Sequence, residues 1–220
     1  MAAWVEATSS RARRTPRARC RTTATATTCC NEPDRDCARC PRLAAFRAQN
    51  RVAFPDFHNA PVPSEGGVCA RILVVGLAPA LKGGNRSGLP FRGDASGRWL
   101  RAALDRHGLG EDMVRITNAV RCVPPANRPT AAEVAACRPF LVGELSGPEL
   151  RVALALGRVA HDAVFGALGL RGAAFGHGAV HALGRLTLVD SYHPSPQNTN
   201  TGRLTPAMFD AVFKTLKDLL

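Results

Sequence analysis

The chain has 220 residues, of which 45% are hydrophobic, and this is enough for one domain with a substantial buried core. Its 29 lysine and arginine residues outnumber 17 acidic residues, and the net charge of +12 favours a polyanionic partner such as nucleic acid or a lipid surface. No apolar run approaches the roughly 20 residues of a membrane span, and the N-terminus lacks the apolar core of a signal peptide. We therefore expect an intracellular, cytoplasmic protein that does not bind membranes.

The first segment of the chain, residues 1–28, contains six arginines against one glutamate, with Ala, Thr and Ser between them. It offers little that a core could bury, so we expect a disordered basic tail. Residues 29–220 are expected to form a single domain. Cys20, Cys29 and Cys30 lie in or beside the tail, and we do not expect them to bind a metal.

Apolar runs alternate with helical segments through the rest of the chain. We expect a short helix near Leu43, and then strands over 71–76, 114–118, 151–156 and 185–190 and helices over 97–107, 131–145, 158–168 and 206–219. Thr130 and Glu133 form a predicted capping box, and Thr205 precedes a proline that suits a first helical position. This alternation predicts a parallel sheet with helices on both faces, a three-layer α/β/α sandwich.

A long glycine-rich loop, residues 76–94, follows the first predicted strand and precedes a helix with Ser96 near its N-cap. Open α/β sheets bind ligands at the carboxyl ends of their strands. Two further polar segments, 116–122 and 191–200, lie at the ends of other apolar runs. The three loops together predict a site at this sheet edge, whereas residues 76–94 alone could also form a mobile surface loop.

Four of the eight cysteines suit a metal centre. Cys37 and Cys40 have C-x2-C spacing, which lets one turn present two thiolates, and Cys122 and Cys137 are available from elsewhere in the fold. Zinc and a [4Fe–4S] cluster both accept four thiolates, so this spacing does not choose between them. Scattered core cysteines are the remaining interpretation.

Four motifs occur in order along the chain: CARCPRL from residue 37, GLAPA…GGNRSGLPFRGDASG from residue 76, TNAVRC from residue 117 and YHPSPQNTNTG from residue 192. Together they resemble the iron–sulfur uracil-DNA glycosylases over residues 37–220, with family 5, the B-type enzymes, as the most similar branch. The resemblance implies a four-stranded parallel sheet between helices, and excision of deaminated bases from DNA. It also implies a structural [4Fe–4S] cluster held by four ligands: Cys37, Cys40, Cys122 and Cys137.

The resemblance includes one departure from most of the superfamily. Many relatives carry an acid in the first motif, where this chain has Leu77 and Ala78. That pair is typical of the B-type branch, whose members accept hypoxanthine and xanthine as well as uracil. The departure leaves open which residue activates water.

We expect the extruded base to lie between the glycine-rich loop and the end of the second predicted strand. Gly76 and Ala78 would line this pocket, Phe91 offers a ring for stacking, and Asn118 offers an amide that matches a pyrimidine edge. A core phenylalanine and a turn-capping asparagine are the alternative interpretations of the last two residues.

His193 is the predicted hydrogen-bond donor to the departing base, because negative charge develops on the base as the glycosidic bond breaks. Asn85 is predicted to position the water. Asp94 is the one carboxylate of the first loop, but an acid there also suits the N-terminus of a helix.

The segment 194–199, stiffened by two prolines, is a predicted minor-groove wedge, although an ordinary proline-rich turn is the alternative. Its expected DNA contacts are Ser195, Gln197 and Asn198. Strand cleavage would need an amine nucleophile, and Lys82 is the one lysine in a candidate loop, so we expect a monofunctional, monomeric enzyme that leaves an abasic site. The expected partner is DNA that contains deaminated bases, which makes the protein nucleoid-associated.

Two other functions also fit parts of the sequence. The first is a non-catalytic nucleic-acid-binding module with a structural four-cysteine zinc site, which would not require Phe91, Asn118 and His193 together. The second is a nucleotide-binding enzyme that uses residues 83–88 as an anion cradle. No Gly-Lys-Ser/Thr sequence occurs in that loop, which weakens the second alternative.

Overall fold

The computed structural model describes residues 32–220. The predicted basic tail and the cysteines Cys20, Cys29 and Cys30 lie outside the described residues. No helix within residues 32–220 is long and apolar enough to cross a membrane.

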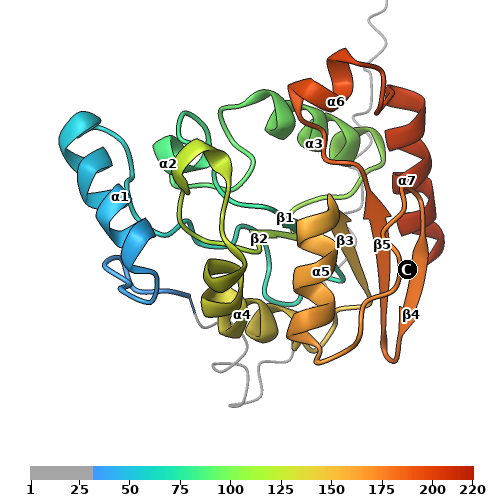
Figure 1. Cartoon of the computed structure of the whole chain (residues 1–220). Coiled ribbons are helices and arrows are strands. Elements are labelled where there is room, and N and C mark those ends of the chain that lie inside the picture. Colours follow the sequence, from blue (N-terminus) through green and yellow to red (C-terminus); the bar gives the residue numbers. More distant parts are fainter. Residues whose placement is uncertain (1–31) are drawn as a thin grey trace, which may run out of the picture.

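The centre of the molecule is a five-stranded sheet with the strand order β2-β1-β3-β5-β4 (Figure 1). Its strands are β1 (Ile72–Gly76), β2 (Val114–Asn118), β3 (Val152–Leu156), β4 (Val180–Leu183) and β5 (Leu186–Ser191). The first four strands in this order are parallel, and β4 runs antiparallel to β5. Every residue of β1, β2 and β3 is buried, as expected for parallel strands that are covered on both faces.

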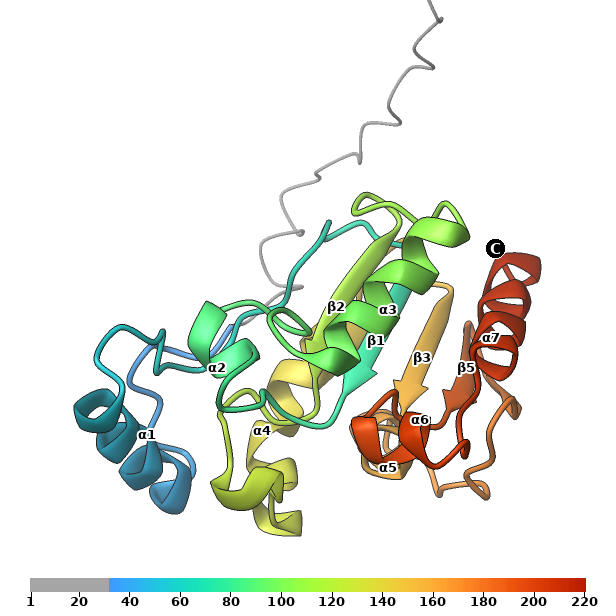
Figure 2. The same ribbon diagram turned by 90° about the horizontal axis from the view of Figure 1, so that it is seen from above.

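Helices cover both faces of the sheet (Figures 1 and 2). One core joins alternate strand residues to α3 (Ala95–Arg106) and α7 (Pro206–Asp218), and the other joins the remaining strand residues to α4 (Ala131–Leu145) and α5 (Arg158–Ala167). This alternation follows from the two-residue period of a strand. The predicted α/β/α sandwich is therefore confirmed.

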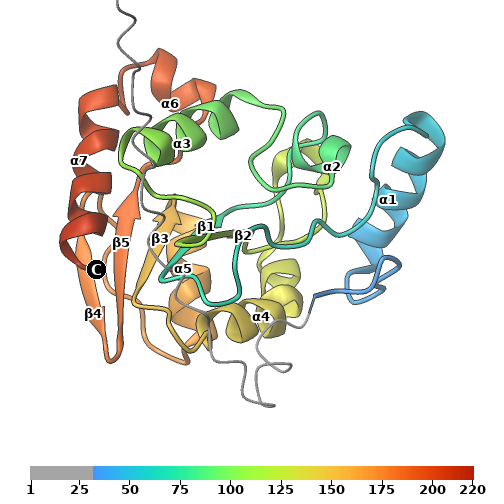
Figure 3. The ribbon, with the colours of Figure 1, turned by 180° about the vertical axis from the view of Figure 1, so that it is seen from behind.

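Three further helices lie outside these two layers. They are α1 (Pro41–Ala53), α2 (Gly84–Ser87) and α6 (Pro196–Asn200). Seen from in front and from behind, α1 lies beyond the β2 edge of the sheet, at the opposite end of the molecule from β4 (Figures 1 and 3).

The short helices α2 and α6 were not predicted, and the predicted elements differ from the structure in three further places. The sheet has a fifth strand, β4, at its edge, and none of the four residues of this strand is buried. The predicted short helix near Leu43 is the 13-residue α1. Helix α3 begins one residue before Ser96, because the Asp94 side chain accepts a hydrogen bond from the Gly97 N–H at 2.7 Å and acts as the N-cap. The predicted caps at Thr130 and Thr205 are confirmed.

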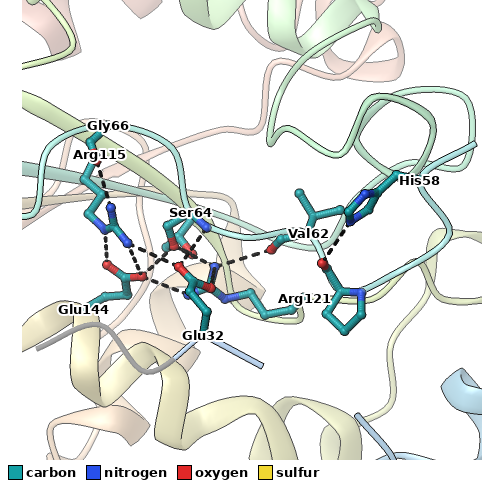
Figure 4. Close-up of polar contacts among 10 residues, drawn as sticks. Glu32, His58, Val62, Ser64, Gly66, Arg115, Arg121 and Glu144 are labelled. Carbon is teal, nitrogen blue, oxygen red and sulfur yellow. Dashed lines mark hydrogen bonds and ion pairs between the residues drawn. The ribbon is translucent and has the colours of Figure 1, made fainter. Parts of the chain in front are cut away.

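A buried ion network fixes the segment that follows β2 (Figure 4). The Arg121 guanidinium donates to Glu144 Oε1 at 3.0 Å and to the Ser64 hydroxyl at 2.6 Å, and both ionic side chains are 2% exposed. Arg115 donates to the other Glu144 oxygen from β2. The Arg121 carbonyl accepts the Val62 N–H at 2.7 Å. Strand β2, helix α4 and the connection before β1 thus meet at one carboxylate.

Burial alone would raise the pKa of Glu144, but the hydrogen bond from Arg115, the charge of Arg121 and the Ser64 hydroxyl hold it below its ordinary value. A lowered pKa in the folded state means that ionised Glu144 stabilises the fold at neutral pH. This contribution is present above the ordinary value of 4.5 and is lost as the pH falls through the lowered pKa.

Substitution of Glu144 by Gln should lower the free energy of unfolding by about 3–5 kcal/mol, because the guanidinium groups of Arg115 and Arg121 lose their buried anionic partner and keep only Glu32, whose side chain is 30% exposed. Urea denaturation followed by circular dichroism measures this loss. The matched control is Glu149→Gln, an exposed position at which we expect a change within about 0.5 kcal/mol. Equal stability of the two variants would contradict the anchoring role of the network.

Candidate active site and cysteine centre

The three predicted loops meet at the carboxyl edge of the sheet and enclose a cavity of about 410 Å³. This volume lies within the range of small-molecule sites. The cavity lies at the C-terminal ends of β1, β2 and β5. Open α/β sheets bind their ligands at this edge. Its lining consists of Leu77, Ala78, Pro79, Ala80, Gly84, Phe91, Asp94, Ala95, Ser96, Asn118, Asn127, His193, Ser195, Pro196 and Gln197.

The floor of the cavity is built from Gly76, Phe91 and Asn118. Gly76 ends β1 beside Asn118 of β2, and a Cβ on Gly76 would lie 2.5 Å from both Asn118 Oδ1 and Phe91 Cζ. Only glycine fits at this position. Phe91 is 8% exposed and Asn118 is 4% exposed, yet the Asn118 amide has no hydrogen-bond partner within the part of the chain that the structure describes. A nearly buried amide that lines a cavity without a partner is available to a ligand.

His193 forms one wall, with its ring centroid 5.9 Å from that of Phe91. Burial lowers the pKa of His193 to about 4, while the charge of Asp94 acts weakly in the opposite direction. The imidazole is therefore neutral at pH 7 and has one N–H to donate.

Asp94 is the only carboxylate among the described residues that line the cavity. Its Oδ1 caps helix α3, as described above, whereas its Oδ2 accepts no hydrogen bond within residues 32–220. One oxygen therefore holds the side chain in place, and the other is free to act.

Of the two predicted catalytic residues, Asn85 does not line the cavity, and neither do Gly76 and Asn198 among the predicted binding residues. Asn85 is 1% exposed, and its amide donates to Asn59 Oδ1 at 2.8 Å. Its main-chain carbonyl also accepts the Asn59 N–H. Asn85 thus joins the glycine-rich loop to the connection before β1.

Most of the segment predicted as a wedge, residues 196–199, lies in the short helix α6. Ser195 and Gln197 line the cavity. Ser195 caps the helix, and the Asn198 side chain donates to the His193 carbonyl at 2.8 Å, so Asn198 holds the main chain of the catalytic candidate.

A trio of His161, His181 and Asp190, of which His161 and Asp190 are buried, also holds the strand that leads to His193. His161 Nδ1 lies 2.8 Å from Asp190 Oδ1, and His181 Nε2 lies 3.0 Å from Asp190 Oδ2. His161 Nε2 is also bonded, at 3.0 Å, to the Ala173 carbonyl. Sequence analysis missed this group because its members come from α5, β4 and β5.

The four predicted cysteine ligands carry free thiols at the contact between α1 and α4. Cys122 and Cys137 are buried against Leu43 and Phe140, and Cys40 packs on the same cluster. Burial raises the pKa of Cys40 to about 11 and that of Cys122 to about 12, and Cys137 adds to both increases. These mutual effects show that the four sulfur atoms share one region.

The spacing of the sulfur atoms discriminates between possible metals. Within residues 32–220, only the His161, His181 and Asp190 trio brings three candidate ligand atoms within 4.8 Å of one another. No three of the four sulfur atoms are therefore that close. A tetrahedral zinc ion with Zn–S bonds of about 2.3 Å would hold its sulfur atoms about 3.8 Å apart. As they are placed, no three of these thiols are close enough together to bind one zinc ion.

Comparison with known proteins agrees with this geometry. Residues 63–217 match the model of the uracil DNA glycosylase superfamily. The chain is 45% identical over 187 residues to a type-5 uracil-DNA glycosylase of Pyrobaculum aerophilum, covering 77% of this chain and 83% of the relative. A type-5 uracil-DNA glycosylase of Thermus thermophilus is 45% identical over 204 residues, which cover 83% of this chain and 93% of the relative.

The fold, the cavity at the sheet edge and these matches define the class: the chain belongs to the uracil DNA glycosylase superfamily. Within the superfamily the type-5 branch is confirmed by relatives at 42–45% identity over most of the chain. A type-4 uracil-DNA glycosylase of Pyrobaculum aerophilum matches less, at 34% identity over 142 residues.

The lowered pKa of His193 predicts that its imidazole takes up a proton with a midpoint near pH 4. The unfolded chain binds this proton near the ordinary value of 6.5, so the burial of His193 costs stability as the pH falls from 6.5 to about 4. Proton–carbon NMR of the histidine rings measures the midpoint, with His193→Gln to assign the signal. A midpoint near 6.5 would show that water solvates the ring.

Proposed function

We propose that the chain is a monofunctional DNA glycosylase that hydrolyses the bond between uracil and deoxyribose and leaves an abasic site. The observation that carries this proposal is one cavity in which a stacking ring, a free amide, a neutral imidazole and a free carboxylate oxygen converge. Its relatives are named as uracil-DNA glycosylases, which supports the same substrate.

A base inside a duplex cannot reach such a cavity, so the nucleotide must be extruded from the stack. Phe91 would stack on the base, a contact that contributes about 1–3 kcal/mol in single-strand binders. The Asn118 amide both donates and accepts, which matches the O4 and N3–H edge of uracil. Exposed basic side chains on the surrounding segments would hold the phosphates: Lys82, Arg98, Arg128, Arg158 and Arg203.

Breaking the glycosidic bond leaves negative charge on the base and positive charge on the sugar. A hydrogen bond from neutral His193 to the base carbonyl oxygen would stabilise the departing anion more than the bound substrate. The free oxygen of Asp94 would stabilise the sugar cation and accept a proton from the attacking water. We assign this second role to Asp94 because Asn85 does not line the cavity.

We extend the proposal to hypoxanthine and xanthine. Both bases present a carbonyl beside an N–H, the same pattern that the Asn118 amide would read in uracil. Ala78 and Gly84 are small residues on the wall of the cavity, and they would leave room for a two-ring base.

The four-cysteine centre suits a [4Fe–4S] cluster, with Cys37, Cys40, Cys122 and Cys137 as ligands. The donor set is four thiols, and their spacing exceeds what zinc requires. A bound cluster supplies a covalent cross-link between the start of α1, the segment after β2 and helix α4. Arg47 donates to Cys122 Sγ at 3.7 Å and to the Cys37 carbonyl at 3.0 Å, so it would offset the negative charge of the thiolates.

The non-catalytic zinc module remains the second candidate function. The sulfur spacing argues against zinc, and binding alone would not need a free carboxylate oxygen beside a neutral histidine in one cavity. Both observations favour the enzyme.

Single-turnover excision of uracil from a duplex tests the catalytic assignment. His193→Ala should slow excision roughly 10²- to 10³-fold because it removes a donor used in the transition state. Asp94→Asn should slow it by about 10²-fold or more, because Asn still caps α3 but cannot accept the proton. Asp105→Asn, at an exposed carboxylate outside the cavity, is the control and should retain the rate.

The product of this assay should be an abasic strand that breaks only in hot alkali, and borohydride should trap no covalent adduct. Unchanged rates for both cavity variants would refute the mechanism. An adduct that disappears in Lys82→Ala would refute monofunctional hydrolysis.

Replacement of Cys137 by Ser should remove iron and the broad absorbance near roughly 400 nm, and should destabilise the fold, because metal binding and folding are coupled at such centres. Cys20→Ser is the matched control and should keep both the colour and the iron. A colourless wild-type protein with one zinc ion would overturn the cluster assignment.

A further inference from the structure

Three side chains that do not line the cavity bring metal-binding atoms together. His161 of α5, His181 of β4 and Asp190 of β5 each offer one ligand atom, and these atoms all lie within 4.8 Å of one another. Among residues 32–220, no other three candidate ligand atoms are this close. His161 and Asp190 are fully buried, whereas the side chain of His181 is 13% exposed. The proposed excision reaction uses none of the three.

The hydrogen bonds of His161 require a positive charge beside its ring. Nε2 lies 3.0 Å from the Ala173 carbonyl oxygen, which can only accept, so Nε2 carries the N–H. Nδ1 faces Asp190 Oδ1 at 2.8 Å, and a carboxylate oxygen also only accepts. A neutral ring would therefore direct a lone pair at a buried anion. Either one further proton between the two groups or a bound metal ion resolves this conflict.

The contacts around the trio match the surroundings of a metal site. A histidine that binds a metal almost always donates its other ring N–H to a main-chain carbonyl, a carboxylate or water, and this contact fixes its tautomer. His161 has such a contact with Ala173. Carboxylate ligands are hydrogen-bonded in turn, and Asp190 Oδ2 accepts the Gly176 N–H at 3.3 Å. Two of the ligands are therefore already oriented by the main chain.

Two imidazole nitrogens and one carboxylate suit zinc. Zinc sites with three protein ligands keep a fourth position for water, and their bonds to nitrogen and oxygen are about 2.0–2.2 Å long. Tetrahedral bonds of this length hold the ligand atoms about 3.3–3.6 Å apart. The contacts of Asp190 with His161 and His181, at 2.8 and 3.0 Å, need to lengthen by less than about 1 Å to reach this spacing.

We infer that His161, His181 and Asp190 form a zinc-binding site that is separate from both the cavity and the cysteine centre. The ion would join the edge strand β4 to β5 and α5, which lie together at one side of the molecule (Figure 1). Asp190 lies three residues before His193, so the ion would stabilise the strand from which the loop of His193 leaves. The inference does not depend on the proposed function, because it concerns metal binding alone.

X-ray absorption at the zinc edge tests the site in the full-length protein. The protein is purified with its cysteine centre as it is, supplied with Zn²⁺ and freed of loose metal by gel filtration, and its zinc and iron are then counted. We expect one zinc ion per chain with a nitrogen and oxygen shell at about 2.0–2.2 Å. Zinc held by the cysteines would instead show sulfur at about 2.3 Å.

His181→Gln is the matched variant, because it removes one imidazole while its amide can still donate to Asp190. It should weaken zinc binding by at least about 10²-fold, the upper end of the loss seen when only an outer partner of a ligand is removed. His177→Gln, at a half-buried histidine outside the trio, is the control and should bind zinc as the wild type does.

Thermal unfolding gives a second measurement. Zinc should raise the midpoint for the wild type and for His177→Gln but not for His181→Gln, because an ion that binds only the folded state stabilises it. A wild type that binds no zinc, or binds it through sulfur alone, would overturn the inference and assign a proton to the contact between His161 and Asp190. Equal zinc affinity of His181→Gln and the wild type would also overturn it. If His181→Gln does not fold, the wild-type absorption spectrum decides.

Discussion

The buried ion pair between Arg121 and Glu144 is the constraint on which the site depends. Asn118 ends β2 at the floor of the cavity, Arg121 lies three residues further on, and Cys122 follows it directly. The buried carboxylate of Glu144, from α4, holds this short segment through its ion pair with Arg121. Moving Arg121 away from Glu144 would leave charged groups buried without this partner, which is energetically costly. The ion pair therefore fixes the position of the segment. The cavity and the cysteine centre are therefore placed by the same contact.

With the proposed cluster bound, this arrangement would let a metal centre support the site without taking part in the proposed reaction. The thiols join α1 to the segment after β2 and to α4, and Arg42 joins α1 again to the rim of the cavity. In the proposed mechanism the chemistry is left to His193 and Asp94, which are held by other contacts: the Asn198 amide supports the loop of His193, and the helix N-terminus of α3 holds Asp94. Positioning of this kind accounts for much of an enzyme's advantage over solution.

The sequence predicted the layers and the four parallel strands, because apolar runs and caps are local patterns, whereas the four-cysteine ligand set stays a prediction. It did not predict β4, whose four residues alternate only between exposed and half-buried, nor the length of α1. The sequence could not separate Asn85 from Asp94 as cavity residues, because both lie in one polar loop. Only the fold shows that the Asn85 amide is already hydrogen-bonded to Asn59. The Asp190 trio depends on contacts between distant segments, which no local pattern reveals.

The most direct test of the account is a crystal structure with DNA that carries a non-hydrolysable 2′-fluoro uracil nucleotide. The account predicts uracil inside the cavity, stacked on Phe91, with its polar edge at Asn118, a carbonyl oxygen within hydrogen-bond reach of His193, and the sugar facing Asp94. A uracil that remains stacked in the duplex, or lies outside this cavity, would contradict it.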